Sequence, residues 1–128
     1  MTDETFLAEF SPLVQDMSVV LDAAQLTSDD PKVKKFVADF TKQTGKAPTK
    51  FNAIGWVQAE LTAEGLRQAK GLNRPCLMRG LEQIKGFETG IIPPVTWGKG
   101  DRSGVEAIGV GKISGSKVTV LENTVPID

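Results

Sequence analysis

Few side chains in this 128-residue sequence could carry out covalent chemistry. The sequence has no histidine and no tyrosine, and its one cysteine is Cys76. A Ser-His-Asp or Cys-His catalytic group therefore cannot form within the chain, and neither can a zinc site built from cysteine and histidine. No phosphate-binding or dinucleotide-binding glycine pattern stands between a strand and a helix. The sequence predicts no catalytic residues, no metal site, no cofactor and no enzymatic activity, because no spacing singles out any of the remaining carboxylates and lysines.

Three further features each have a structural and a functional interpretation. Cys76 is interpreted as a packed or half-exposed residue, because no basic residue adjoins it to make it a nucleophile. Trp56 is interpreted as a helix-packing residue, and a ligand contact is the alternative. A lysine cluster is interpreted as a solvated helix face, with a docking surface as the alternative; its members are Lys32, Lys34 and Lys35.

Charge and hydropathy exclude several classes of partner. The formal net charge is −1 and the basic residues are scattered, so nothing indicates binding to nucleic acid or to an anionic membrane. No apolar run is long enough for membrane insertion. Residues 1–4 are acidic and lack the basic and apolar regions of a secretory signal peptide, so a cytoplasmic location stays open for the chain as it stands.

Helical patterns dominate the first two thirds of the sequence. A short helix is predicted at 4–13, capped by Thr2 or Asp3 and ended early by Pro12. The clearest helix has Asp30 as its cap, Pro31 in its first turn and Gly45 at its end. Two more helices are predicted at about 51–70, with Gly55 and Gly65 inside, and from the cap Asn73 to Gly86. A glycine inside a helix often marks the close approach of another backbone.

Strand patterns occur before and after these helices. Residues 17–22 predict a short strand whose nearly continuous apolar run indicates burial of both faces. Residues 95–97 predict another, and 104–113 and 117–122 predict a hairpin joined by Gly115-Ser116 in a type II′ turn. The predicted fold class is therefore α/β: three to four helices, a short strand, a crossing strand and a C-terminal β-hairpin, forming a single incomplete unit over residues 1–128.

The succession of these motifs resembles the C-terminal part of the type I periplasmic binding proteins. These are the substrate-binding subunits of ABC transporters for branched-chain amino acids and related small acids. The stretch "DDPKVKKFVADFTKQTGKAP" resembles a helix of that family. The segment beginning "FNAIGWVQ" has Gly55-Trp56-Val57-Gln58 where a Gly-Tyr-Asp-Ala element is common. The stretch "TGIIPPVTWGKGDRSG" resembles a Gly-Pro-Val-Thr-Phe strand and the turn after it, with Pro93 in place of the usual glycine and Arg102 where histidine or arginine is usual.

The resemblance implies a non-catalytic capture function and a hinge. Family members clamp a small ligand between two lobes, and the chain crosses between the lobes at a hinge. Two crossings are expected here, near residues 21–31 and 97–104, with hinge residues Asp22, Trp97, Gly98 and Gly100. For the stretch around Trp97 the alternative is a tight turn with an ordinary core aromatic. Of the family's ligand contacts, this sequence is expected to retain Phe51 and Asn52, just before the glycine-aromatic pair. For Phe51 the alternative is a hydrophobic staple at the helix start.

The resemblance also implies partners and a location. The expected partners are an amino acid or small organic acid and an ABC permease, and the expected location is the periplasm. Family members are much longer than this chain, so a second possibility is a stand-alone interaction or assembly module that has lost its ligand.

The apolar stripes of the helices predict self-association. If the helices belong to one lobe and the strands to the other, the sheet that normally covers the helices is not encoded. Each uncovered large aliphatic or aromatic side chain forfeits about 1.5–3 kcal/mol of burial. Several residues are expected to remain uncovered unless copies cover each other; the stripes comprise Val33, Phe36, Val37, Phe40, Ile54, Val57 and Leu61.

Overall fold

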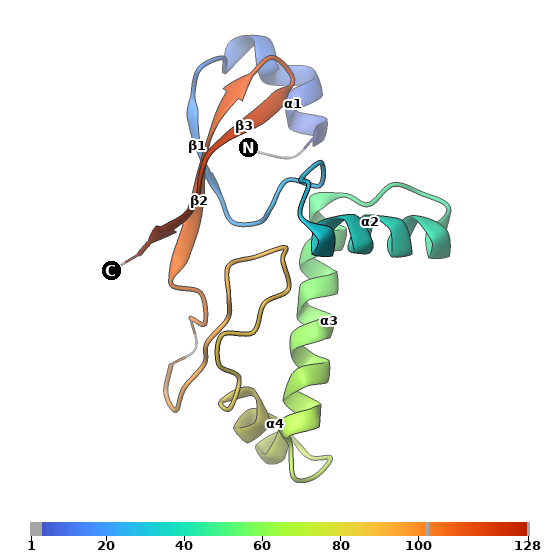
Figure 1. The fold of residues 1–128 in the computed structure, drawn as a ribbon, viewed down its shortest axis with the longest axis vertical. Helices are drawn as coiled ribbons and strands as arrows, with labels where there is room; N and C mark the ends of the chain where they lie inside the picture. The colour runs from blue at the N-terminus through green and yellow to red at the C-terminus, as the bar shows by residue number, and fades with distance from the viewer. Residues whose placement is uncertain (1–3, 102, 128) are drawn as a thin grey trace.

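A computed structural model describes residues 4–101 and 103–127. The elements in chain order are α1 (Glu4–Phe10), the short 3-10 helix η1 (Ser11–Leu13), β1 (Ser18–Leu21), α2 (Pro31–Thr44), α3 (Lys50–Gln68), α4 (Arg74–Leu81), β2 (Ala107–Ser114) and β3 (Lys117–Pro126). Figure 1 shows two parts along the long axis of the molecule: a sheet part with α1 at one end, and a helical part with α2, α3 and α4 at the other. The predicted α/β class is confirmed.

The sheet part is one antiparallel sheet with the strand order β1-β2-β3. One face packs against α1 through Leu7, Val19, Leu21 and Ile113, all buried. The glycines of β2 lie on this same face and allow close packing: a Cβ on Gly109 would lie 3.0 Å from the Leu21 Cβ. This face of β2 therefore packs closely against Leu21.

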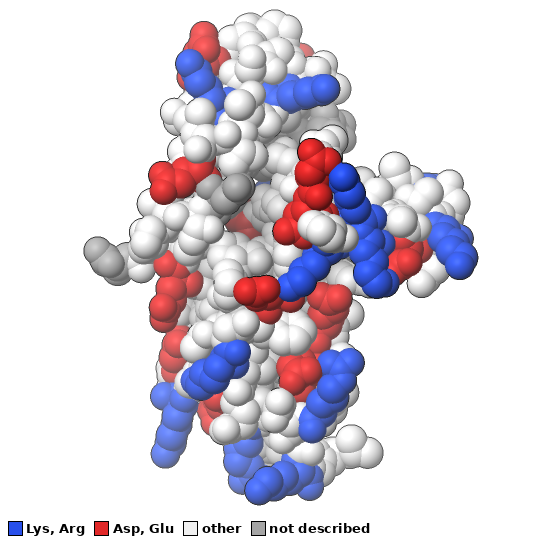
Figure 2. Space-filling view, viewed as in Figure 1, with Lys and Arg blue, Asp and Glu red and all other residues white. Residues whose placement is uncertain are grey.

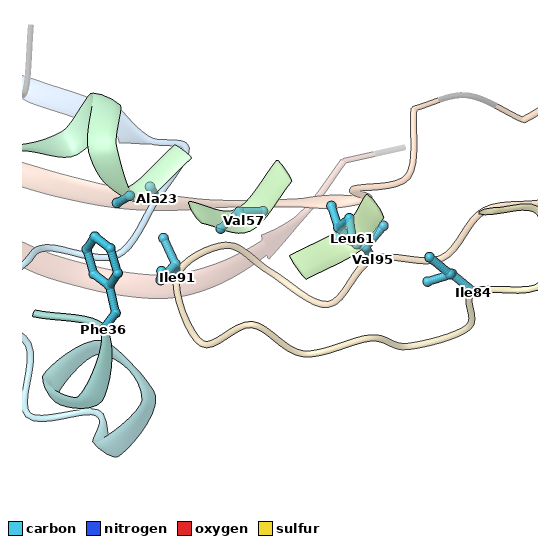
Figure 3. Close-up of a cluster of buried hydrophobic side chains, with 8 residues drawn as sticks. Ala23, Phe36, Val57, Leu61, Ile84, Ile91 and Val95 are labelled. Atoms are coloured by element: carbon cyan, nitrogen blue, oxygen red, sulfur yellow. The ribbon is translucent and has the colours of Figure 1, made fainter. Parts of the chain in front are cut away.

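The helical part has its own hydrophobic cluster, which Figure 3 shows. Phe36 from α2 and both Val57 and Leu61 from α3 pack against Ile91 and Val95 of an irregular segment, 84–97. Within that segment only a single bridge forms, between Phe87 and Val95. An irregular stretch of this chain therefore occupies the place beside the helices where a sheet was expected.

This packing corrects the prediction of uncovered stripes. Val33, Phe36, Val57 and Leu61 are all buried within one copy of the chain. The other three stripe residues, Val37, Phe40 and Ile54, are partly buried against the same cluster. The prediction failed because segment 84–97, which carries Ile84, Ile91 and Val95, folds back along the helices without forming a strand ladder.

Capping residues and glycines predicted both ends of α2 and the turn of the hairpin correctly. The Asp30 side chain accepts a hydrogen bond from the Lys32 N–H, and Gly45 adopts φ 70°, so α2 begins and ends as predicted. Gly115 has φ 61°, and no positive φ occurs at Ser116, as a type II′ turn requires. The proposed caps Thr2 and Asp3 lie outside the described residues.

Four details differ from the predictions. The helix predicted from the cap Asn73 to Gly86 ends at Leu81. The strand predicted at 95–97 is reduced to one bridge, between Val95 and Phe87. β1 is not buried on both faces, because the Val20 side chain is 59% exposed. Gly55 meets nothing within 4 Å, so it does not mark a close backbone approach, whereas Gly65 does.

Candidate ligand-binding site and hinge

The first segment that joins the two parts is 22–30, between β1 and α2. Its first residue, Asp22, forms an ion pair of 2.5 Å with Lys50 at the start of α3. Two residues later the Ala24 N–H donates to the Ile91 carbonyl at 2.6 Å. The segment is thus attached to the helical part from its beginning, and Asp22 stands where the chain leaves the sheet.

The second joining segment is 98–106, between the helical part and β2. It starts with a tight turn in which the Asp101 N–H donates to the Gly98 carbonyl at 3.2 Å and Gly100 has φ 84°. A positive φ at the third turn position is the mark of a type II turn, which glycine adopts without strain. The Ser103 hydroxyl and N–H donate to the Asp101 carboxylate at 2.9 and 3.0 Å, and these bonds hold the pKa of that carboxyl below its ordinary value.

Trp97 fastens this second segment to the helical part. The backbone N–H of Trp97 donates to the Ile84 carbonyl at 3.0 Å, and the backbone carbonyl of Trp97 accepts from the Lys85 ammonium. Its indole lies against Gly104, where a Cβ would lie 2.2 Å from the ring Nε1. The glycines around Trp97 therefore have two functions: Gly100 permits the turn, and Gly104 leaves room for the ring. Arg102, between them, lies outside the described residues.

A pocket of about 710 Å³ lies where the sheet part meets the helical part. Its walls come from the first joining segment, from segment 90–94 and from the α1-facing side of the sheet. Figure 2 shows a hollow between the two parts, beside a group of acidic and basic side chains. The apolar walls are Leu21, Ala23, Ala24, Ile91, Ile92, Pro93, Pro94, Val118 and Val120, and the polar ones include Gln25, Thr27, Ser28, Asp29, Asp30 and Thr124.

The two carboxylates in the pocket wall already have partners. Asp30 caps α2, and Asp29 forms an ion pair of 2.7 Å with Lys34. A hydrogen bond from Lys34 holds the pKa of the Asp29 carboxyl below its ordinary value. The pocket therefore combines apolar walls with hydroxyls and engaged carboxylates, which suits recognition more than acid–base chemistry.

The structure does not bring the predicted ligand contacts into this pocket. Phe51 lies in the first turn of α3 with its side chain 75% exposed, and it is therefore not packed as a staple at the helix start. Asn52 forms a capping box with Thr49, whose N–H donates to the Asn52 Oδ1 at 2.8 Å. Both residues follow Lys50 in the first turn of α3, and Lys50 forms the ion pair with Asp22. Sequence reasoning missed segment 90–94 as a pocket wall, and the signal that marks it in the sequence is the Pro93-Pro94 pair.

The remaining candidates have structural partners. Trp56 packs against Phe36 with ring centroids 5.3 Å apart and donates to the Glu60 carboxylate at 3.0 Å, so packing is confirmed. Cys76 is half-buried on α4, as interpreted. The lysine cluster is exposed and ion-paired: Lys32 with Glu88, Lys34 with Asp29 and Lys35 with Asp39. Over the described residues, no group of side chains has the composition to hold a metal ion, and no helix is long and apolar enough to span a membrane.

A family model described as periplasmic binding protein matches residues 1–117. The chain belongs to this family. Periplasmic binding proteins of this kind act in transport and bind their substrates without covalent chemistry. The family membership therefore agrees with the small number of side chains in this sequence that could act in catalysis.

Solved structures of similar fold come from ABC transport systems. A branched-chain amino acid ABC transporter protein from Thermus thermophilus with bound valine matches with a TM-score of 0.83 and 12% identity, over 97% of this chain and 37% of that one. A fatty acid ABC transporter substrate-binding protein from Thermomonospora curvata matches with a TM-score of 0.78 and 18% identity, over 98% of this chain and 34% of that one. A solute-binding protein from R. palustris in complex with benzoate matches with a TM-score of 0.69 and 20% identity, over 99% of this chain and 35% of that one. The chain thus spans about a third of the length of each of these binding proteins. A comparison with curated protein sequences gives no significant match.

Proposed function

We propose that this chain acts as part of the solute-binding component of an ABC transporter, capturing a small carboxylate without chemical change. The observation that carries the proposal is the two-part arrangement: two separately packed clusters, joined by two segments, with a pocket at their junction. A ligand held between two such parts can be enclosed when they rotate about the joining segments. Membership in the periplasmic binding protein family supports the same function.

The proposed ligand is an amino acid or a small organic acid with an apolar body. Valine and benzoate, bound by two of the similar proteins, both combine a carboxylate with an aliphatic or aromatic group. The pocket at the junction offers aliphatic and proline walls together with hydroxyls of Thr27, Ser28 and Thr124. Phe51 and Asn52 lie outside this pocket, and they are proposed to reach the ligand when the two parts close, Phe51 at its apolar part and Asn52 from the same helix turn.

The proposed hinge follows the two joining segments. Asp22 marks the start of the first, and Trp97, Gly98 and Gly100 mark the start of the second. Because the type II turn after Trp97 contains two glycines, its backbone dihedrals can change at low cost while Trp97 stays fastened to Ile84. The proposed partner of the loaded protein is an ABC permease, and the proposed location is the periplasm.

The alternative that we propose is a stand-alone interaction or assembly module in which ligand binding has been lost. Self-association stays a proposal from the sequence alone, because the helix stripes that suggested it are covered within one copy of the chain.

Thermal unfolding with a panel of carboxylates tests ligand capture. The panel comprises valine, leucine, isoleucine, phenylalanine, benzoate and a medium-chain fatty acid. A ligand at a hundred times its Kd stabilises the folded state by about 2.7 kcal/mol, which corresponds to a rise in Tm of roughly 10 °C for a chain of this size.

The matched variants are Phe51→Ala and Leu72→Ala, because both residues are large, exposed and apolar, Phe51 in the first turn of α3 and Leu72 in the loop after α3. Stabilisation by one carboxylate that Phe51→Ala reduces and Leu72→Ala leaves intact supports the proposed site. No stabilisation by any panel member contradicts ligand capture by this chain and favours the assembly module.

A further inference from the structure

One ion pair connects the end of the sheet part to the helical part. Asp22, which directly follows β1, pairs at 2.5 Å with Lys50 in the first turn of α3. The other ion pairs that the structure describes lie within the sheet part, within the helical part, or between α2 and the first joining segment. The hydrophobic clusters of the two parts share no residue. The Asp22–Lys50 pair is therefore a polar contact whose length depends on the angle between the two parts.

Asp22 lies where the chain passes from one part to the other. Leu21, just before it, is buried in the cluster of the sheet part, and Ala23, just after it, is buried in the cluster of the helical part. The next residue is held as well, because the Ala24 N–H donates to the Ile91 carbonyl at 2.6 Å. In the first joining segment, a rotation between the parts must therefore be absorbed by the backbone dihedrals around Asp22.

Lys50 lies on a firmly held helix turn. The start of α3 is the end of that helix nearer the sheet part (Figure 1). The Thr49 side chain accepts from the Asn52 N–H, and the Thr49 N–H donates to the Asn52 Oδ1 at 2.8 Å. The Lys50 side chain is 24% exposed and that of Asp22 is 62% exposed. The pair is thus partly shielded from water, yet it stays open enough to respond to salt.

We propose that the Asp22–Lys50 ion pair is a latch that holds the two parts at one angle and so sets how far the junction pocket is open. This inference rests on the function proposed above and deepens it, since enclosure of a ligand needs a change of this angle. Neither residue lines the pocket, so both are positioning residues. Asp22 is followed in sequence by the pocket wall, and Lys50 is followed by Phe51 and Asn52. The pair therefore also sets how far these two proposed contacts lie from the pocket.

The size of the effect follows from the exposure of the pair. A partly exposed ion pair makes a modest contribution, so its loss should change the ratio of held to released arrangements by about two- to fivefold. Released arrangements place the two parts at many angles. Loss of the pair should therefore broaden the distribution of distances between the parts.

Pulsed electron resonance on the ligand-free chain measures this distribution. Spin labels at Leu121 of the sheet part and Leu72 of the helical part, both exposed, are placed in a Cys76→Ser background with diamagnetic chain in excess. Lys50→Met and Asp22→Asn each remove one charge of the pair, and each should broaden the distribution. Because the two charges act through each other, the double variant should broaden it no further than either single variant.

Control variants separate the latch from a general loss of charge. Lys35→Met removes an ion pair of the same 2.5 Å length, with Asp39, that lies wholly within α2, so it should leave the distribution unchanged. Lys50→Arg keeps the charge and should keep the distribution narrow. Raising the salt from about 0.1 M to about 1 M shortens the screening length from about 10 Å to about 3 Å. It should broaden the distribution of the wild type and have little effect on Lys50→Met.

The outcomes distinguish the latch from a purely structural ion pair and from ligand capture. A structural pair would lower the free energy of unfolding in Lys50→Met and leave the distances unchanged; that result overturns the latch, and so does equal broadening by Lys35→Met. Circular dichroism checks that each variant keeps its fold. Ligand capture is tested separately by thermal unfolding with the carboxylate panel. A chain that a carboxylate stabilises, but whose distances ignore Lys50→Met, loses only the latch. A chain whose distances respond, but which no carboxylate stabilises, loses only ligand capture.

Discussion

Gly104→Ala probes the contact that fastens the second joining segment. Gly104 has φ 74°, and a Cβ there would lie 2.2 Å from the Trp97 Nε1 and 2.8 Å from two further ring atoms. The Thr96 N–H also donates to the Gly104 carbonyl at 2.9 Å, so the backbone cannot simply move away from the ring. The substitution must therefore displace the indole or break this hydrogen bond.

Two costs combine in this variant. The left-handed backbone conformation costs an alanine about 1–2 kcal/mol. Inserting a methyl group into a contact this close adds a further 1–3 kcal/mol, as overpacking usually does. We expect Gly104→Ala to lower the free energy of unfolding by about 3 kcal/mol.

Gly100→Ala is the matched control in the same segment. Gly100 has φ 84°, but a Cβ there would meet nothing within 4 Å, so only the backbone cost of about 1–2 kcal/mol applies. Urea denaturation followed by circular dichroism gives both free energies of unfolding. Trp97 emission, recorded in a Trp56→Phe background, reports whether the indole has moved toward solvent.

A double-mutant cycle separates the ring contact from the backbone strain. In a Trp97→Ala background the methyl group meets no indole, so Gly104→Ala should then cost no more than Gly100→Ala. Equal costs of Gly104→Ala and Gly100→Ala in the wild-type background would refute the contact. So would a cost of Gly104→Ala that is the same with and without the indole.

Further substitutions test the helix packing and one carboxylate. At Gly80 a Cβ would lie 2.1 Å from the Gly65 carbonyl oxygen, so Gly80→Ala should separate α3 from α4 and cost about 3 kcal/mol or more in thermal or urea unfolding. Gly55→Ala should stabilise the chain by about 0.5–1 kcal/mol, because its Cβ meets nothing within 4 Å; a destabilised variant would contradict that open space. The pKa of Asp101 is lowered in the folded chain from its ordinary 3.8, so its stabilising effect is present above that value and is lost as the pH falls through the lower folded pKa. Asp101→Asn should therefore lose less stability on acidification than the wild type. The free energy of unfolding in urea, measured from neutral to acidic pH, tests this. The same pH dependence in variant and wild type would contradict the effect of the Ser103 hydrogen bonds on the Asp101 carboxyl.

Features fixed by neighbours in sequence were predictable. The Asp30 cap, the Gly45 end and the Gly115 turn each depend on one side chain and the backbone within a few residues, so the sequence is enough to place them. The absence of histidine likewise excluded Ser-His-Asp and Cys-His catalytic groups within this sequence before any fold was known.

Features fixed by distant residues were not predictable in the same way. α4 stops at Leu81 and not at Gly86, and the Ile84 carbonyl instead accepts from the Trp97 N–H. Val95 forms only one bridge, because Pro93 and Pro94 precede it without N–H groups and Phe87 is its sole partner. The covering of the helices by segment 84–97, and the pocket wall at 90–94, depend on how the chain folds back over many residues.

The candidate site also has features that were predictable from the sequence and features that were not. The order of motifs, which resembles one family, predicted crossings near residues 21–31 and 97–104, and glycines and prolines cluster only around the second. That the two joining segments act as a hinge stays a prediction. The sequence did not place Phe51 relative to the pocket, since that depends on how the two parts meet.

Distance measurement between the two parts tests ligand capture by enclosure most directly. In a Cys76→Ser background, spin labels at Leu121 of the sheet part and Leu72 of the helical part, both exposed, report the separation by pulsed electron resonance. With diamagnetic chain in excess to suppress distances between copies, a stabilising carboxylate should shorten and narrow the distance distribution. An unchanged distribution at a saturating concentration of such a ligand would contradict closure about the joining segments.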